Sequence, residues 1–176
     1  MPWYVILIAE IIALYWTMPN SWRINPRLRK IQFLKHAAFT HIDSSICFVG
    51  DCHARAAPFP VARLGVPKSD IKDLIPYIER AKLNSDLFVV ITGTIAVGER
   101  RAPAKITEEL EEVKLALLRK NPDSTVIIIS PALIHQIAQI DGAGDGWHLW
   151  EPGYFLLLAH YPQIAARLNA SNRLDP

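Results

Sequence analysis

Four short apolar runs, rich in β-branched residues, recur along the chain after its first quarter. They span residues 46–50, 61–66, 87–92 and 125–130. Because they lack the alternation of apolar and polar residues seen in half-exposed strands, they are typical of strands covered on both faces. Stretches with the apolar spacing of helices lie between them. This pattern predicts an α/β domain with a mostly parallel sheet of about four to five strands.

Three stretches have the apolar spacing of helices. Residues 67–82 form the first, in which Pro76 predicts a break or a kink. Residues 103–120 form the second, and basic residues occupy its last turn, as the helix dipole favours. A last helix is predicted over about residues 152–168. A chain of 176 residues can bury one substantial core, so we expect a single α/β domain over residues 45–176.

The N-terminus differs from the rest of the chain. Residues 3–18 are apolar except for Glu10 and Thr17. A helix over this run would be about 24 Å long, slightly short of a ~30 Å hydrocarbon core. We expect residues 1–22 to form a single-pass transmembrane anchor helix that precedes the domain; the alternative is a helix buried against the domain. A basic juxtamembrane connector follows over residues 23–44.

The side chains of this anchor indicate whether lipid or other helices surround it. Trp3 and Tyr4 at one end, with Trp16 and Trp22 at the other, have the distribution of interfacial aromatic belts. Basic residues follow on one side only, which favours a cytoplasmic C-terminal domain. Glu10 makes insertion of a lone helix marginal, and an intramembrane acid usually pairs with a group on another helix. We therefore expect contact with the bilayer and with other transmembrane subunits of a complex.

Charge and cysteine content exclude several classes of site. The 19 basic and 17 acidic residues leave a net charge of +2, which does not support bulk electrostatic binding of nucleic acid. Cys47 and Cys52 would lie about 16 Å apart on an extended strand, too far for a disulfide. His53, Asp145 and His148 share with Cys52 the chemistry of zinc ligands, but their spacing follows no regular ligand pattern. We predict no metal and no other cofactor.

Three motifs fall at the carboxyl ends of predicted strands, where parallel α/β domains keep their chemistry. They are residues 48–53 (FVGDCH), 91–96 (ITGTIA) and 145–149 (DGWHL). In their order and spacing they resemble the sequence blocks of the SGNH (GDSL) hydrolase family, over roughly residues 46–168. The resemblance implies a flavodoxin-like, three-layer α/β fold. It also marks the chain as a degenerate member of that family, because two of the family's functional positions differ.

The resemblance assigns roles residue by residue. Asp145 and His148 match the acid and the base of the family's catalytic triad, and Cys52 stands where the family has its nucleophilic serine. Gly65 matches the second-block glycine, so the backbone N–H groups of Gly65 and Cys52 are the implied oxyanion donors. Cys52 is expected near a helix N-terminus, which favours a thiolate. His53 is expected to be a surface or turn residue.

The other departure bears on catalysis more strongly. Ile95 stands where the family has its oxyanion asparagine, and Ala96 where an aspartate follows. Loss of one oxyanion donor typically costs ~10²–10³ in rate, or roughly 3–4 kcal/mol. Thr94 is an alternative donor if the third block is shifted along the chain. Catalysis is otherwise expected to be impaired, and whether the chain is an enzyme stays open at this point.

Three functions fit these features. The first is an accessory or structural subunit of a larger membrane protein complex, tethered by its N-terminal helix. The alternative is a membrane-tethered ester or thioester hydrolase with a Cys52–His148–Asp145 triad. The third is a non-catalytic binder that keeps the family's cleft for a small acyl ligand. The missing oxyanion amide favours the accessory subunit.

Overall fold

The structure, a computed structural model, describes residues 34, 37–140 and 148–171 of the chain. The chain divides into two compact units, Met1–His36 and Ala37–Pro176. All helices and strands below belong to the second unit, which begins ahead of the predicted domain boundary at residue 45. The second unit carries the candidate site.

The predicted membrane anchor falls on a part of the chain that the structure does not describe. Trp3, Tyr4, Glu10, Trp16 and Trp22 all lie outside the described residues. Within the ranges that are described, no helix is both long enough and apolar enough to cross a bilayer. The anchor and its partners therefore stay predictions from the sequence.

Four parallel strands form the central sheet, in the order β3-β2-β5-β6. Their bounds are β2 Ile46–Gly50, β3 Ala62–Gly65, β5 Leu87–Ile91 and β6 Thr125–Ile128. All four lie on predicted apolar runs, so the prediction of a parallel α/β sheet is confirmed. Numbered along the chain, these strands have the order second, first, third, fourth, as in flavodoxin-like sheets. The strand order reverses between β2 and β5, which is where open α/β sheets bind ligands.

A second, two-stranded parallel sheet consists of β1 (His41–Asp43) and β4 (Lys82–Asn84). Its strands begin level with each other, since His41 pairs with Lys82. The Asn84 side-chain amide also donates to Asp43 Oδ1 at 2.8 Å. The sequence did not predict this sheet, because three-residue strands with exposed ends carry too little pattern. Strand β1 lies within the stretch predicted to be a connector.

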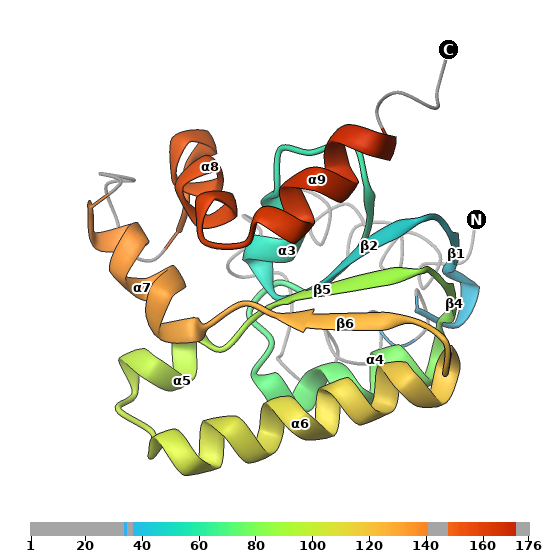
Figure 1. Ribbon diagram of the computed structural model, residues 1–176. Coiled ribbons are helices and arrows are strands. Elements are labelled where there is room, and N and C mark those ends of the chain that lie inside the picture. The colour runs from blue at the N-terminus through green and yellow to red at the C-terminus, as the bar shows by residue number, and fades with distance from the viewer. Residues whose placement is uncertain (1–33, 35–36, 141–147, 172–176) are drawn as a thin grey trace, which may run out of the picture. The chain divides into compact units, whose positions relative to one another are not determined.

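Helices cover both faces of the central sheet. Figure 1 shows α3, α8 and α9 on one face, with α4 and α6 on the other. The helix bounds are α3 Cys52–Ala56, η1 Ile71–Leu74 (a 3₁₀ turn), α4 Ile75–Arg80, α5 Thr94–Gly98, α6 Pro103–Lys120, α7 Pro131–Ile140, α8 Glu151–Ala159 and α9 Pro162–Ser171. The predicted helix over residues 103–120 is confirmed as α6.

The other helix predictions need correction. The stretch 67–82 is a 3₁₀ turn followed by α4, and Pro76 lies in the first turn of α4. A proline is tolerated there because its missing N–H would have had no intrahelical partner. The predicted last helix is two helices, since α8 ends at Ala159 and α9 begins at Pro162. Helix α7 was not predicted, although Pro131 at its start was a usable signal.

Both faces of the two central strands are buried, which explains their unbroken apolar sequences. Side chains alternate between the faces. One face packs against α7, α8 and α9 in a core that includes Ile46, Phe48, Leu87, Val89, Ile91, Ile134, Tyr154, Leu157 and Ile164. The opposite face, toward α4 and α6, carries Cys47, Val49, Phe88 and Val90, all buried. The turns at the carboxyl ends of β2 and β5 thus start from rigid strands.

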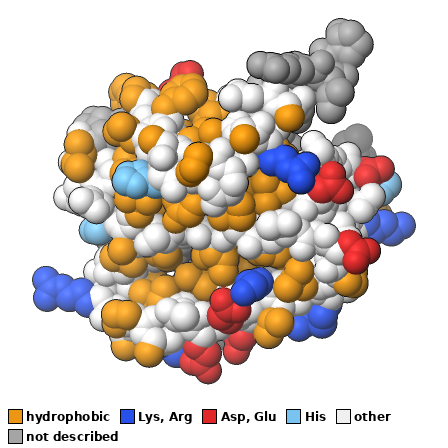
Figure 2. Space-filling model, viewed as in Figure 1, with side chains coloured by type: hydrophobic (Ala, Val, Ile, Leu, Met, Phe, Trp, Pro, Cys, Tyr) orange, Lys and Arg blue, Asp and Glu red, His pale blue; other side chains and the backbone are white. Residues whose placement is uncertain are grey.

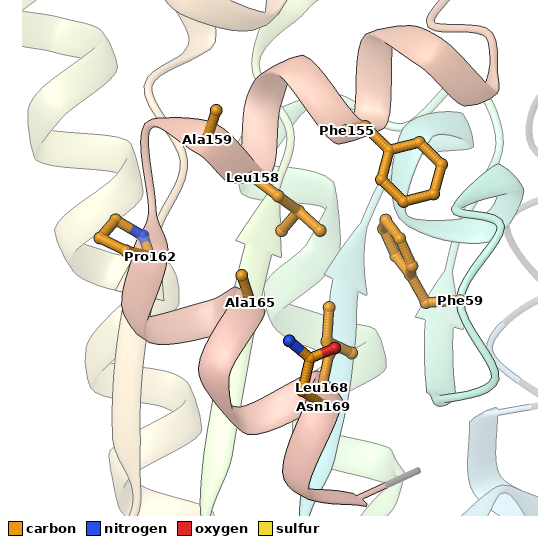
Figure 3. A pocket seen from close by; sticks show the side chains of 8 residues that line it. All are labelled: Phe59, Phe155, Leu158, Ala159, Pro162, Ala165, Leu168 and Asn169. Carbon is orange, nitrogen blue, oxygen red and sulfur yellow. The ribbon is translucent and has the colours of Figure 1, made fainter.

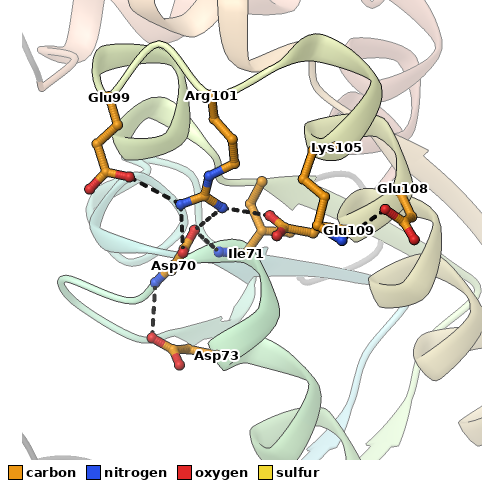
Figure 4. Close-up of polar contacts among 8 residues, drawn as sticks. All are labelled: Asp70, Ile71, Asp73, Glu99, Arg101, Lys105, Glu108 and Glu109. Carbon is orange, nitrogen blue, oxygen red and sulfur yellow. Dashed lines mark hydrogen bonds and ion pairs between the residues drawn. The ribbon is translucent and has the colours of Figure 1, made fainter.

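An ion-pair cluster around Arg101 joins the segment before η1 to the start of α6 (Figure 4). Arg101 donates to both carboxylate oxygens of Asp70, at 2.8 and 3.1 Å. It also donates to Glu109 at 2.6 Å and to Glu99 at 3.1 Å. Asp70 caps η1 by accepting from Ile71 N at 2.7 Å. Partial burial opposes ionisation of Asp70, but hydrogen bonds from Arg101 and Ile71 outweigh it and lower the pKa of Asp70.

We predict that Asp70→Asn lowers the free energy of unfolding by about 1–2 kcal/mol at neutral pH, because Arg101 loses a charged hydrogen-bond partner. Because the pKa of Asp70 is lower in the folded state, its charge stabilises the fold above about pH 4. That contribution is lost as the pH falls through the folded-state pKa. Urea unfolding of both chains at neutral and at acidic pH measures the difference, which should close in acid.

The exposed pair between Lys105 and Glu108 supplies the control. Glu108→Gln should change the stability by less than about 0.5 kcal/mol, since exposed ion pairs contribute little. A deficit of Asp70→Asn that is as large in acid as at neutral pH would show that the charge of Asp70 is not what stabilises this cluster.

Candidate functional site

The turn that follows β2 holds the candidate site. A side chain at Gly50 would place its Cβ 1.9 Å from the carbonyl oxygen of Ile91, so only glycine lets β2 and β5 approach this closely. The backbone N–H of Asp51 donates to that same oxygen at 3.2 Å. Helix α3 then begins at Cys52, which confirms the prediction that Cys52 lies at a helix N-terminus. The turn therefore lies at the reversal of strand order.

Asp51, Cys52 and His53 form one polar cluster at this turn. As the N-cap of α3, Asp51 accepts from the backbone N–H of His53 at 2.9 Å. The same carboxylate oxygen lies 2.8 Å from His53 Nδ1, and both side chains are 1% exposed. Since a carboxylate only accepts hydrogen bonds, Nδ1 carries the proton. Cys52 Sγ lies 3.8 Å from that nitrogen.

The electrostatics of the cluster favour a charged His53. Burial alone would lower the pKa of His53, but the hydrogen bonds and charges of Asp51 and Cys52 outweigh it and raise that pKa to about 10. His53 is then an imidazolium at neutral pH. A neighbouring cation favours the thiolate form of a cysteine. The cluster thus places a buried cation beside the sulfur of Cys52.

The prediction that His53 is a surface or turn residue is wrong. It is almost fully buried, and its ring faces the carboxylate two residues earlier. That His53 follows Cys52 in the sequence does not indicate which way the His53 side chain points. A usable signal was present, however: an aspartate at a strand-to-helix turn caps the helix through the N–H of the second helical residue. That bond brings the side chain of the same residue close to the carboxylate.

His148 reaches the cluster from a distant part of the sequence. Its ring stacks on that of His53, with 5.6 Å between centroids and 25° between planes. His148 itself is exposed, just before α8. Asp145, the predicted triad acid, lies in the segment 141–147, outside the described residues. The structure therefore brings His148 to the turn that holds His53, and the role of Asp145 stays a prediction.

Tyr154 holds the cluster against α8. Its hydroxyl donates to the backbone oxygen of His53 at 2.8 Å. Burial raises the pKa of this hydroxyl, so it remains a neutral donor. The ring of Phe59 packs edge-on against Tyr154, with centroids 6.3 Å apart. No role for Tyr154 was predicted from the sequence, whereas the structure makes it a buried support of α3.

The two cysteines have opposite environments. Both are free thiols, as expected from their sequence spacing. Cys47 is fully buried on β2, and burial raises its pKa to about 12. Cys52 is half-buried and lies beside His53. Only Cys52 combines partial access to solvent with a polar neighbour.

The structure describes the surroundings of the three positions that the resemblance links to the oxyanion, namely Gly65, Cys52 and Ile95. A Cβ at Gly65 would lie 2.5 Å from Arg55 Cβ, so close packing of α3 on β3 already requires this glycine. The N–H of Cys52 is in the first turn of α3, where N–H groups lack intrahelical acceptors. Ile95 is half-buried on α5, just after Gly93, whose φ of 96° favours glycine. The oxyanion roles of Gly65 and Cys52 stay predictions.

An apolar groove lies beside the cluster but is not part of it. Figure 3 shows it between α8, α9 and Phe59, with a volume of about 490 Å³. Its lining residues are Phe59, Phe155, Leu158, Ala159, Pro162, Ala165, Leu168 and Asn169. Apolar side chains also gather over α8 and α9 in Figure 2. Phe59 contacts both Phe155 in the groove and Tyr154 behind the cluster.

Comparisons with known proteins bear on the fold. No protein-family model matches the chain, and no curated protein matches it. A solved structure from Streptococcus pneumonia, of a protein proposed to be a platelet activating factor, matches with a TM-score of 0.56. The match covers 92% of this chain and 99% of that chain, at 14% sequence identity. At this identity the likeness concerns architecture alone, and it supports an SGNH-like α/β fold for the chain.

Proposed function

We propose that the chain is an acyl hydrolase of esters or thioesters in which Cys52 is the covalent nucleophile. One observation carries the proposal: Cys52 Sγ lies 3.8 Å from His53 Nδ1, which itself lies 2.8 Å from Asp51 Oδ1. This cluster occupies the end of β2 in an SGNH-like sheet, where that family keeps its nucleophile.

Acyl transfer to sulfur is the first step. The Cys52 thiolate, stabilised by the His53 imidazolium, attacks the carbonyl carbon, and the carbonyl electrons move onto oxygen. When this tetrahedral intermediate collapses, the bond to the alcohol or thiol breaks. The leaving group takes a proton from His148, whose exposed ring stacks on His53. The acyl group is then held as a thioester on Cys52.

Hydrolysis of that thioester completes the cycle. His148, now neutral, accepts a proton from water, and the resulting hydroxide attacks the thioester carbonyl. The second tetrahedral intermediate expels the Cys52 thiolate and releases the acid. His148 regains the proton that it gave in the first step. Asp145 would orient His148 in this scheme, as the resemblance to SGNH hydrolases implies.

The two histidines have different tasks in this proposal. His53 directs its Nδ1 proton to Asp51 and stays charged, so it stabilises the thiolate and does not act as the base. Its role is electrostatic, whereas proton transfer belongs to His148. The sequence-based triad of Cys52, His148 and Asp145 thus gains a second pair, Asp51 and His53, which the family resemblance did not assign.

A covalent intermediate provides the test. We predict that p-nitrophenyl acetate transfers one acetyl group to Cys52, and that hydroxylamine removes it because it is a thioester. Peptide mass spectrometry locates the group. Cys52→Ala should abolish both labelling and turnover, whereas Cys47→Ala, on the other buried thiol, should retain them. Acetyl groups on lysines alone, or unchanged turnover in Cys52→Ala, would contradict the proposal.

The same assay measures the effect of Ile95. We predict that Ile95→Asn raises the turnover number by up to about 10²-fold, because it restores an amide donor to the oxyanion. Ile95→Leu, which adds no donor, is the matched control and should leave turnover unchanged. The half-exposed position on α5 can hold either side chain without burying a polar group. Equal rates in the two variants would contradict the assignment of Ile95 to the oxyanion position.

The absence of an amide at Ile95 and Ala96 favours a second candidate, in which the domain has lost catalysis. In this alternative the chain is a single-pass membrane protein, with a cytoplasmic domain that braces other transmembrane subunits of a complex. The apolar N-terminal run with its central Glu10 supports this alternative. Cross-linking from position 10 in native membranes would capture such subunits, whereas recovery of the chain alone would count against it.

A further inference from the structure

The residues of the Asp51–Cys52–His53 cluster also form a set of metal ligands. A carboxylate oxygen, a thiol sulfur and an imidazole nitrogen lie within 4.8 Å of one another. These are the ligand types that zinc prefers in proteins. The sequence predicted no metal, because Cys52, His53, Asp145 and His148 follow no regular ligand spacing. The turn into α3 brings the side chains of Asp51, Cys52 and His53 together instead.

The distances in the cluster approach those of a zinc site. With Zn–S near 2.3 Å and Zn–N near 2.0–2.1 Å, a tetrahedral ion separates sulfur from nitrogen by about 3.6 Å. Cys52 Sγ and His53 Nδ1 are 3.8 Å apart, which fits without rearrangement. The ligand oxygen and nitrogen should lie about 3.3 Å apart. Asp51 Oδ1 and Nδ1 are 2.8 Å apart, so this pair must open slightly once the shared proton leaves.

A separate observation points to a cation at this place. Asp51 is 1% exposed, and its second carboxylate oxygen, Oδ2, is buried with no hydrogen-bond partner among the described residues. A buried carboxylate oxygen without a partner is costly. A divalent cation beside the carboxylate would compensate that oxygen. Cys52, which is half-buried, leaves a route from solvent to the cluster.

We propose that Asp51, Cys52 and His53 bind a zinc ion, with water in the remaining coordination position. Binding requires that Cys52 and His53 Nδ1 give up their protons, since zinc takes the thiolate and the neutral imidazole. A sulfur coordinated to zinc is not available to attack an acyl carbonyl. Zinc would therefore inhibit the acyl transfer proposed above, and this consequence alone rests on the proposed function.

Cobalt substitution tests the site directly. Titration of the full-length chain with Co²⁺ should give a near-ultraviolet charge-transfer band from sulfur and the visible bands of a tetrahedral ion, at one ion per chain. Zinc should displace the ion and remove both bands. Cys52→Ala should lose the charge-transfer band, whereas Cys47→Ala should keep it. A wild-type chain without that band, or a band that persists in Cys52→Ala, would overturn the proposal.

Asp51→Asn keeps the N-cap of α3 but lacks the charged ligand, and thermal unfolding monitors whether it is folded. We expect at least tenfold weaker Co²⁺ binding in this variant, and unchanged affinity would exclude Asp51 as a ligand. Zinc should also protect Cys52 from iodoacetamide. Cobalt bands without acetyl transfer would refute only the hydrolase, and acetyl transfer without cobalt bands would refute only the metal site.

Discussion

The hydrogen bond between Asp51 and His53 is the interaction on which the site depends. Asp51 is held at the end of β2 by the close approach of Gly50 to β5, and it caps α3 through the backbone of His53. Its carboxylate then compensates the charge of a buried imidazolium, which would otherwise be strongly disfavoured away from water. Cys52 lies between these two residues in the sequence, and its sulfur is 3.8 Å from His53 Nδ1. Tyr154 secures the other side of His53 from α8.

Much of the fold could be predicted from the sequence, whereas the site could be predicted only in part. Strands β2 and β5 are buried on both faces, so their apolar runs were readable, and Pro103 with the apolar spacing after it marked α6. Short elements such as β1 and β4 were missed because three residues carry no period. The family resemblance placed His148 near the turn that holds Cys52, and its ring stacks on that of the adjacent His53. The burial of His53 was not predicted from the sequence, because the direction of the His53 side chain depends on the helix cap that Asp51 forms.

The site differs from the SGNH pattern in two ways that act against each other. A cysteine sulfur is a stronger nucleophile than a serine oxygen, and in the proposed mechanism Cys52 attacks as a thiolate beside the His53 imidazolium. An isoleucine at the oxyanion position, which the family resemblance assigns to Ile95, would remove stabilisation from the transition states that follow. The expected outcome is a chain that acylates readily and turns over slowly. A proton and a metal ion would compete for His53 Nδ1. The proton favours the thiolate form of Cys52, whereas the proposed metal ion would bind that thiolate.

The rate at which Cys52 is alkylated in the folded chain, relative to the unfolded chain, tests whether the Asp51–His53 pair activates this thiol. A Cys47→Ala background leaves one thiol, and a chelator excludes metal. Partial burial alone would slow iodoacetamide in the folded chain, whereas the Asp51–His53 pair should accelerate it by favouring the thiolate. We expect faster alkylation in the folded chain at neutral pH, and loss of that advantage in His53→Gln. A folded chain that reacts no faster than the unfolded one would contradict this activation.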